Sequence, residues 1–501
     1  MPVLSGTVLG RKWWTLIVVC TAIFMLLLDI TIVNVALPPI ARSLRATFTD
    51  LQWVIDAYAL TLATFVLNAG SLADLFGRKR VFVSGVVLFT GASVFCGAAT
   101  SPLFLILARA GQGVGGAIMF ATSLALLSQE FQGRERGTAF GIWGATTGAA
   151  VAIGPLVGGA LTTWLSWRWI FFVNIPIGVS ATAISVAKLR ETRDEEHGGV
   201  DAIGLLTLSG ALFTFVFALL RGNDKGWSSP LIVGMLFAGV VLLAAFVLAQ
   251  WRGRRPMIDL GLFRKPAFTG AQITAFALSS AVFAMFLYLT LYLQNYLGYS
   301  AIQTGLRFLP ITLLSFVCAA VSGKLSGFAP VRLLLAGGLT LCAVGLLLLH
   351  GLSIHSSWTA LLPGFVLMGA GIGAVNPALA STAIGVVPPR QAGMASGTNN
   401  TFRQVGIASG IAALGALFEH HIRVTTHLRG AALNLVSSGR AHPSANVADS
   451  FFDRTSPAQA FIGGLNELFV AGAIVAATGA VLALTLVRRR DFAAAAAPAQ
   501  R

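Results

Sequence analysis

Fourteen long apolar segments, separated by short polar stretches, constrain this chain more than any other feature. With ends placed to within a few residues, they are 13–37, 51–73, 81–99, 103–128, 137–163, 169–187, 202–220, 230–250, 268–296, 303–323, 331–350, 358–386, 391–418 and 461–486. Segments of roughly 20 apolar residues cross a bilayer as helices. Isolated strands would leave backbone groups unpaired in lipid, and the sequence lacks the alternating pattern of a membrane β-barrel. The sequence therefore predicts an all-α integral membrane protein with fourteen transmembrane helices.

Composition supports a lipid environment and argues against several other classes. The chain is 56% hydrophobic and 10% charged, whereas a soluble domain carries roughly 25% charged residues. The net charge of +16 would suggest nucleic acid in a soluble protein, but here the cations lie in short loops without interleaved aromatic residues. We therefore expect no nucleic-acid partner. The four cysteines fall inside predicted spans and are interpreted as small apolar residues.

The distribution of Lys and Arg predicts the orientation in the membrane. If the N-terminus is cytoplasmic, 22 of these residues lie in cytoplasmic segments and nine lie outside. This asymmetry follows the positive-inside rule and favours an even number of spans. We expect both termini in the cytoplasm of a bacterium and the spans in its inner membrane. The long segment 419–460 is then an outer loop, and its histidines lack a metal-ligand pattern, so no metal is expected.

A repeated loop indicates that the chain is built from two related halves. The second span ends in Gly70-Ser-Leu-Ala-Asp74-Leu-Phe-Gly77-Arg78, and the tenth ends in a degenerate copy, Gly323 to Arg332, that lacks the aspartate. Both loops follow the second helix of a half if the seventh and eighth spans are an inserted pair. A duplicated transporter has its substrate site between the halves, near the middle of the membrane. The sequence thus predicts two six-helix pseudo-repeat bundles plus an inserted helix pair.

This interpretation divides the chain into five parts. They are an N-terminal six-helix bundle (1–190), a charged linker with the inserted pair (191–267), helices nine to thirteen of the C-terminal bundle (268–418), the outer loop (419–460), and the last helix with a cytoplasmic tail (461–501).

Two opposite charges inside the membrane are the strongest indication of function. A central Asp or Arg costs about 2.5–3.5 kcal/mol on the translocon scale. Asp29 lies well inside the first span, and Arg109 lies at a similar depth in the fourth, both ~10–12 Å from the outer end by helical rise. A carboxylate whose cationic partner or water access changes with conformation can take up and release a proton. We favour this proton-coupling role over the alternative of a static ion pair that joins two helices.

Further polar and aromatic residues in the spans are candidates for the substrate cavity. Arg403 lies in the polar run Thr398–Gln404, where it serves either an anionic substrate group or a structural hydrogen-bond network. An aromatic, weakly polar cavity favours lipophilic or cationic compounds, although Trp and Tyr near span ends are also ordinary interface anchors. The candidates are Asn34, Trp53, Asp56, Tyr58, Tyr288, Tyr292, Gln294, Asn400 and Arg403.

Two glycine-containing motifs are candidates for moving parts. The fifth span carries Gly154-Pro155 and Gly158-Gly159; small residues allow close helix contact and proline favours a bend. These residues either form a tight helix contact that closes and moves during transport, or simply allow two helices to pack closely. In the loop with Gly70, Asp74, Gly77 and Arg78, we expect Asp74 to accept hydrogen bonds from a neighbouring helix N-terminus and to latch the cytoplasmic side. Arg78 also contributes to the positive charge that sets topology.

Several motifs resemble those of the major facilitator superfamily, in the correct order along nearly the whole chain. Gly70-x-Leu-Ala-Asp74-x-x-Gly77-Arg78-Lys79 is similar to its loop motif after helix 2, Leu105-x3-Arg109-x2-Gln112-Gly113-x-Gly115 to its helix 4 motif, and Gly154-Pro155-x2-Gly158-Gly159 to its antiporter motif. Leu28-Asp29-x-Thr31-Ile-Val-Asn34, Trp167-Arg-Trp169 through Asn174-Ile-Pro176, and Ala395-Ser-Gly through Thr401-x-Arg403-Gln404 resemble its fourteen-helix drug–proton antiporter branch. One departure is Ala150, where the antiporter motif usually begins with glycine. The resemblance implies proton-coupling roles for Asp29 and Arg109 and an antiporter seam around Pro155.

The sequence and the resemblance together favour a secondary active transporter. The expected activity is proton-coupled efflux of small lipophilic or cationic compounds by alternating access. The alternative is a dedicated exporter of one native metabolite, antibiotic or lipid on the same fold. A third possibility is a channel or a membrane-bound enzyme. The sequence has no catalytic triad or metal-ligand spacing, which argues against an enzyme, and no phosphate-binding loop, which argues against ATP as the energy source. We expect protons as the coupling ion, no cofactor, and a monomer in the bilayer, with any adaptor protein left open.

Overall fold

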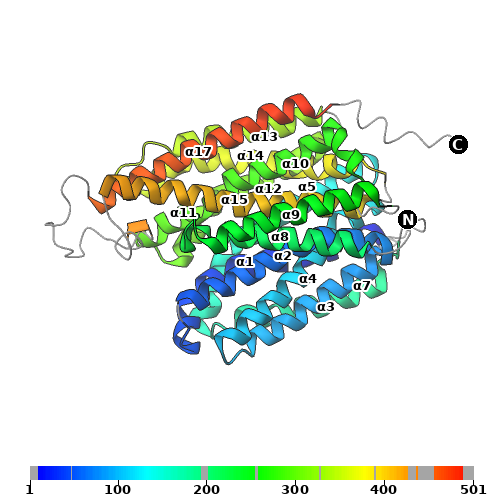
Figure 1. Ribbon diagram of the computed structural model, residues 1–501, viewed down its shortest axis with the longest axis horizontal. Coiled ribbons are helices and arrows are strands. Elements are labelled where there is room, and N and C mark those ends of the chain that lie inside the picture. Colours follow the sequence, from blue (N-terminus) through cyan, green and yellow to red (C-terminus); the bar gives the residue numbers. More distant parts are fainter. Residues whose placement is uncertain are drawn as a thin grey trace, which may run out of the picture.

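A computed structural model describes residues 10–46, 48–192, 201–253, 258–326, 329–388, 391–426, 436–437 and 456–488. Long helices lie side by side, and the start of α1 (Arg11–Leu44) and the end of α17 (Pro457–Leu486) are at one end of the molecule (Figure 1), here called the terminal end. The opposite end is called the distal end. Thirteen helices in the described residues are long and apolar enough to cross a membrane, and α5 (Gly133–Trp164) occupies the remaining predicted span. The described helices thus account for all fourteen predicted spans.

The first six spans surround two groups of buried apolar side chains. Their helices are α1 (Arg11–Leu44), α2 (Phe48–Phe76), α3 (Arg78–Gly97), α4 (Pro102–Glu130), α5, and a sixth span made of α6 (Trp169–Phe172) and α7 (Asn174–Lys188). Within this bundle α4 packs on α2 and α3, and α5 packs on α1. Two glycines of α4 explain the close approach: a Cβ on Gly113 would lie 2.5 Å from the Tyr58 carbonyl, and one on Gly115 would lie 2.6 Å from the Phe89 nitrogen.

The inserted pair consists of α8 (Ala202–Lys225) and α9 (Pro230–Arg252), which pack on each other. Helix α8 also contacts α2 of the first bundle and α15 (Ala392–Thr426) of the second. Only 17% of the apolar window of α9 is buried, the smallest share among the thirteen spans. Helix α9 therefore presents most of its surface to lipid.

The remaining spans enclose the largest apolar core. The first of them is a composite span of α10 (Pro266–Leu278), η2 (Ser279–Phe283), α11 (Met285–Leu291) and η3 (Tyr292–Tyr296). The others are α12 (Ala301–Leu325), α13 (Val331–Leu349), α14 (Leu362–Gly385), α15 and α17 (Pro457–Leu486). Two short 3-10 turns, η1 (Leu260–Arg264) and η4 (Trp358–Leu361), precede α10 and α14. The elements η2 and η3 are π-helical turns, in which Ala284 and Leu297 donate to carbonyls five residues earlier. Such turns widen a helix locally.

Serine caps start several helices at the distal end. Ser101, Ser229, Ser300 and Ser456 each accept a hydrogen bond from a backbone nitrogen in the first turn of α4, α9, α12 and α17. Capping removes an unpaired donor from the membrane surface. In three of these helices proline follows in the first turn, where no backbone donor is needed.

Helix α15 extends further than the sequence indicated, which corrects the predicted start of the outer loop at 419. The helix continues to Thr426, because Phe418 and Ile422 remain buried and His421 Nδ1 lies 2.7 Å from Glu467 Oε1 of α17. Residues 419–426, which are mostly polar and were predicted to lie in the outer loop, therefore belong to a helix. Residues 427–435 and 438–455 of that loop, His427 included, lie outside the described residues. No group of three or more potential metal ligands occurs in the described part of the chain.

Glycine seams join the two bundles at the terminal end. Helix α5 packs on α12, where Gly137 and Gly323 meet: a Cβ on Gly323 would lie 3.0 Å from the Cα of Gly141 and closer still to the Gly137 carbonyl. Helix α2 packs on α15 through Gly70 and Gly393. Helices α5 and α2 thus each form a backbone-to-backbone contact with the other bundle.

We expect Gly323→Leu to force this seam apart and to lower the thermal stability of the purified protein, because the nearest atoms are backbone and cannot move aside. Overpacking of this kind typically costs about 1–3 kcal/mol. Gly91→Leu is the matched control, since a Cβ at Gly91 would meet nothing within 4 Å. Equal melting temperatures for the two variants in detergent would contradict the seam.

Candidate functional site

Asp29 and Arg109 are in direct contact inside the N-terminal bundle. Arg109 Nη1 donates to Asp29 Oδ2, and the two side chains are 2% and 0% exposed. Arg109 also donates from Nε to the carbonyl of Val54, at 3.1 Å, and from Nη1 to Gln112 Oε1, at 2.8 Å. The pair that the sequence placed at one depth therefore joins α1 to α4 and, through a backbone carbonyl, to α2.

The other carboxylate oxygen of Asp29 is held by two amide groups. Gln112 Nε2 and Asn174 Nδ2 donate to Asp29 Oδ1 at 3.2 and 3.1 Å. Both amides also approach the hydroxyl of Ser93, at 2.7 and 3.4 Å. Four helices, α1, α3, α4 and α7, thus contribute to one buried network. The network satisfies the carboxylate with one guanidinium and two amide donors, as a buried charge requires.

Aromatic rings cover the guanidinium. The Arg109 Cζ lies 4.2 Å from the centre of the Tyr58 ring and 5.9 Å from that of Phe171. Gly113, one position past Gln112 on α4, permits the close α2–α4 approach that brings Tyr58 to this position. Cation–π contact favours the charged guanidinium in this dry site.

Gln112, Asn174 and Ser93 were not predicted as site residues. Gln112 and Asn174 do lie in two of the motifs that carry the family resemblance. Their place in these motifs is the sequence feature that could have identified them as site residues. The depth of a residue along its helix follows from sequence, but the side of the helix that faces Asp29 depends on packing.

Asn400 and Arg403 are two buried polar residues of α15. Asn400 Nδ2 donates to the Phe120 carbonyl of α4 at 3.3 Å, across the boundary between the bundles, and its Oδ1 has no hydrogen-bond partner. Arg403 is three residues further along and thus on nearly the same face. Its guanidinium is buried, with Cζ 5.8 Å from the centre of the Phe283 ring and no ion-pair partner in the described residues. The two side chains form a buried polar face with unused hydrogen-bonding capacity.

The other predicted cavity residues divide into separate groups. Tyr58 lies beside Arg109, while Asp56 forms a 3.0 Å ion pair with Arg221 of α8, whose guanidinium also lies 4.5 Å from the Trp53 ring. The sequence did not indicate this ion pair, because Arg221 directly follows the predicted span 202–220. The ion pair attaches the inserted pair to α2.

Three predicted cavity residues lie in the composite span of the C-terminal bundle. The hydroxyls of Tyr288 and Tyr292 donate to the carbonyls of Ile411 and Ser356, at 3.1 and 3.2 Å, within that bundle. Gln294 is half-buried in η3. The side chain of Asn34 lies outside the described residues. The structure therefore does not gather all nine candidates into one site, and their cavity roles stay predictions.

The predicted gate motif joins α2 to the N-terminus of α15. Asp74 accepts hydrogen bonds from the backbone nitrogens of Gly393, at 3.2 Å, and Met394, at 2.9 Å. Arg78 donates from Nε and Nη2 to the same carboxylate at 2.9 and 2.7 Å. Gly77 makes the turn with a φ of +105°, a conformation that side chains rarely adopt. The contacts tie the two bundles together at the terminal end.

The predicted antiporter motif packs α5 directly onto α1. Gly158 lies against Ile32, whose carbonyl would be 3.0 Å from a Cβ at that position, and Gly154 lies against Thr31. Gly159 faces the other way and contacts Ile302 at the start of α12. The side chain of Pro155 lies outside the described residues. Helix α5 thus touches α1 one turn from Asp29 and also touches the opposite bundle.

The fold and this site define a membrane transporter of a known class. Residues 19–411 match the Major Facilitator Superfamily, and the chain belongs to that family. The human organic anion transporter MFSD10 (TETRAN) has the same fold, with a TM-score of 0.63 over 93% of this chain and 99% of that one at 14% identity.

Relatives of similar length are bacterial resistance and export proteins. The chain is 36% identical to the puromycin resistance protein pur8 of Streptomyces alboniger over 99% of this chain and 95% of the relative. It is 36% identical to the multidrug resistance protein Stp of Mycobacterium tuberculosis, over 90% and 83%. It is 31% identical to the tetracenomycin C resistance and export protein of Streptomyces glaucescens, over 95% and 91%. The chain is a transporter and not an enzyme.

We expect Arg109→Gln to destabilise the protein at neutral pH by about 3–5 kcal/mol, because it leaves the Asp29 charge buried and uncompensated. The double variant Asp29→Asn/Arg109→Gln should recover most of the loss, because no buried charge is then left without a partner. Thermal unfolding in detergent at neutral pH measures this, and equal destabilisation of the single and the double variant would contradict it.

Proposed function

We propose that this transporter exports small lipophilic or cationic compounds from a bacterial cell in exchange for protons. The observation that carries the proposal is the buried Asp29–Arg109 contact, which is the one site in the described spans where a carboxylate and a guanidinium meet deep in the N-terminal bundle, away from the helix ends. The names of the relatives, which refer to puromycin, tetracenomycin C and multidrug resistance, support export of drug-like compounds.

The orientation in this proposal places the terminal end in the cytoplasm and the spans in the cell membrane. The excess of Lys and Arg in the loops assigned to that end supports this orientation. The Asp74 contacts and the glycine seams then close the cytoplasmic side. The described conformation is accordingly one in which access from the cytoplasm is blocked.

Proton binding at Asp29 is the proposed coupling step. A proton on the carboxylate cancels its charge and weakens the ion pair, while the Val54 carbonyl and Gln112 continue to accept from Arg109. The position of α1 relative to α4 and α7 then depends on whether Asp29 carries a proton. In the described conformation the network is closed to water, so uptake or release of the proton requires the helices to move.

Direct contacts between helices connect this site to the opposite bundle. Thr31 and Ile32 of α1 lie one turn from Asp29 and contact Gly154 and Gly158 of α5. Helix α5 in turn contacts α12 at both Gly159 and Gly137. A shift of α1 is therefore transmitted to the seam that closes the cytoplasmic side, as alternating access requires.

Asn400 and Arg403 are the residues that we propose to contact the substrate. Both are buried on α15. Asn400 faces α4 and keeps an unpaired amide oxygen, and Arg403 lies beside the Phe283 ring with no ion-pair partner in the described residues. We further propose that the protein works as a monomer without a resident cofactor.

A second candidate function is dedicated export of one native compound. It is favoured by relatives that are named for single antibiotics, puromycin and tetracenomycin C. A growth-inhibition panel in an efflux-deficient host separates the two: protection against many unrelated compounds supports the first function, and protection against one supports the second.

We expect Asp29→Asn to insert and fold, because the Val54 carbonyl and Gln112 still accept hydrogen bonds from Arg109, but to lose proton-driven transport. In everted vesicles, wild-type uptake of puromycin or ethidium should require a proton gradient, collapse with a protonophore and need no ATP. The Asp29→Asn variant should show less than about a tenth of wild-type uptake, because its side chain holds no exchangeable charge. Glu135→Gln, which alters an exposed ion pair with Lys12, is the matched control and should transport normally. Full uptake in Asp29→Asn would refute the coupling role.

A further inference from the structure

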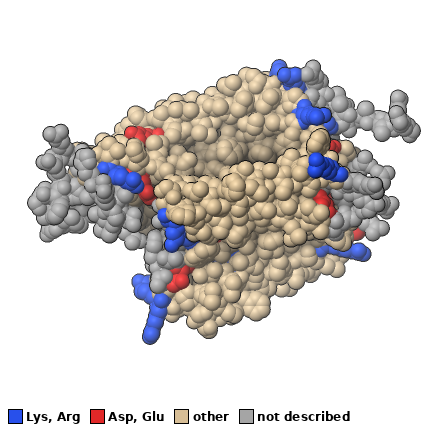
Figure 2. Space-filling model, viewed as in Figure 1, with Lys and Arg blue, Asp and Glu red and all other residues tan. Residues whose placement is uncertain are grey.

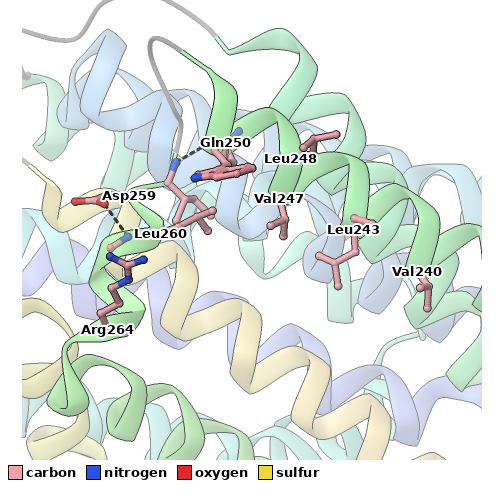
Figure 3. Close-up of a pocket in the computed structure, with 12 residues that line it drawn as sticks. Val240, Leu243, Val247, Leu248, Gln250, Asp259, Leu260 and Arg264 are labelled. Atoms are coloured by element: carbon pink, nitrogen blue, oxygen red, sulfur yellow. Dashed lines mark hydrogen bonds between the residues drawn. The ribbon is translucent and has the colours of Figure 1, made fainter.

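A groove of about 870 Å³ lies between α9 and η1 at the terminal end, apart from the proposed transport site. Figure 3 shows Val240, Leu243 and Val247 pointing from α9 toward one side, with Leu260 and Arg264 at one end of the row. Figure 2 shows that this side of the molecule is hollowed. Because α9 is the least buried span, the groove is accessible to lipid in a membrane.

The long wall of the groove is purely apolar. Val240, Leu243, Val247 and Trp251 recur at intervals of three or four residues and so form one stripe on α9. From Val240 to Trp251 the stripe extends ~16 Å at the rise of an α-helix. This length corresponds to about half of the ~30 Å hydrocarbon core, which is the depth of one leaflet. The wall therefore matches the length of a single acyl chain in the leaflet at the terminal end.

The end of the groove is fixed by hydrogen bonds. Gln250 is buried; its Nε2 donates to Asp201 Oδ2 at 2.6 Å, and its Oε1 accepts from the backbone nitrogen of Ile258 at 3.0 Å. Asp259 Oδ1 accepts from the Gly261 nitrogen at 2.9 Å and caps η1. These hydrogen bonds hold the segment before α10 across the end of α9. This end of the groove is therefore formed by a hydrogen-bonded segment of the chain.

The mouth of the groove carries positive charge at the level expected for lipid headgroups. Arg264 lines the groove and is exposed, Arg252 ends α9 and is exposed, and Trp251 lies beside them. Asp259 is the carboxylate that lines the groove, and one of its oxygens is occupied by the η1 cap. Trp is enriched at membrane interfaces, and cations at the membrane surface attract anionic lipids.

We propose that this groove is a binding site for an anionic phospholipid, with one acyl chain along the α9 stripe and the phosphate at Arg264. The apolar wall provides affinity for hydrocarbon, and the arginine selects the charge of the headgroup. The bound lipid fills the space between the inserted pair and the segment that leads into the C-terminal bundle.

Native mass spectrometry of the detergent-purified chain tests the proposal, with phosphatidylglycerol and phosphatidylcholine as probes. The wild type should retain one phosphatidylglycerol in preference to phosphatidylcholine. Arg264→Gln should weaken retention of phosphatidylglycerol roughly fivefold, as expected for loss of one surface cation, and Arg264→Lys should restore it. Arg332→Gln, at an exposed arginine at the start of α13, is the matched control and should bind as the wild type does.

A second variant tests the acyl-chain wall without changing charge. Leu243→Trp should reduce retention of both lipids by filling the groove, whereas Leu347→Trp should not; the two leucines are equally exposed, at 49%. Equal retention of the two lipids by the wild type would overturn the proposal, as would equal binding by Arg264→Gln and Arg332→Gln. A dimer lost on Leu243→Trp would instead assign the groove to a second copy of the chain and overturn it as well.

Discussion

The buried contact between Asp29 and Arg109 is the interaction on which the rest of this structure depends. Each charge alone would be costly in the apolar interior of the bundle, and together they require the close convergence of their helices. Gln112 and Asn174 complete the carboxylate's hydrogen bonds, and the Ser93 hydroxyl accepts a hydrogen bond from Gln112. Gly113 and Gly115 allow α4 to approach its neighbours. The geometry of α1, α3, α4 and α7 is therefore coupled to the charge on one carboxylate.

The contacts around this network explain how a local change of charge can have a global effect. Helix α5 contacts both bundles, since its glycines pack on α1 one turn from Asp29 and on α12 of the other bundle. The Asp74 contact with the N-terminus of α15 closes the same end through α2. Backbone-to-backbone seams have few intermediate positions, because no side chain can adjust to a small shift. Such seams suit a protein that alternates between two states.

The sequence predicted the fourteen spans and the common depth of Asp29 and Arg109, because hydropathy and helical rise depend only on position along the chain. It did not identify Gln112 and Asn174, because the side of a helix that faces the site depends on packing. The Asp56–Arg221 pair was missed because an arginine near a span end looks the same whether it faces water or a neighbouring helix. Tyr288 and Tyr292 were predicted to line a cavity, yet their hydroxyls find carbonyl partners inside one bundle, which sequence cannot distinguish. The end of α15 was placed too early because His421 and Glu467 are polar but pair with each other.

The most direct test of the account is to measure protons released when substrate binds to the purified protein in weakly buffered detergent solution. If substrate and proton compete through the Asp29 network, binding of a compound that the vesicle assay shows to be transported should release close to one proton per wild-type molecule. Asp29→Asn should bind the compound and release none. Proton release by Asp29→Asn equal to that of the wild type would contradict the central claim, even though the fold would stand.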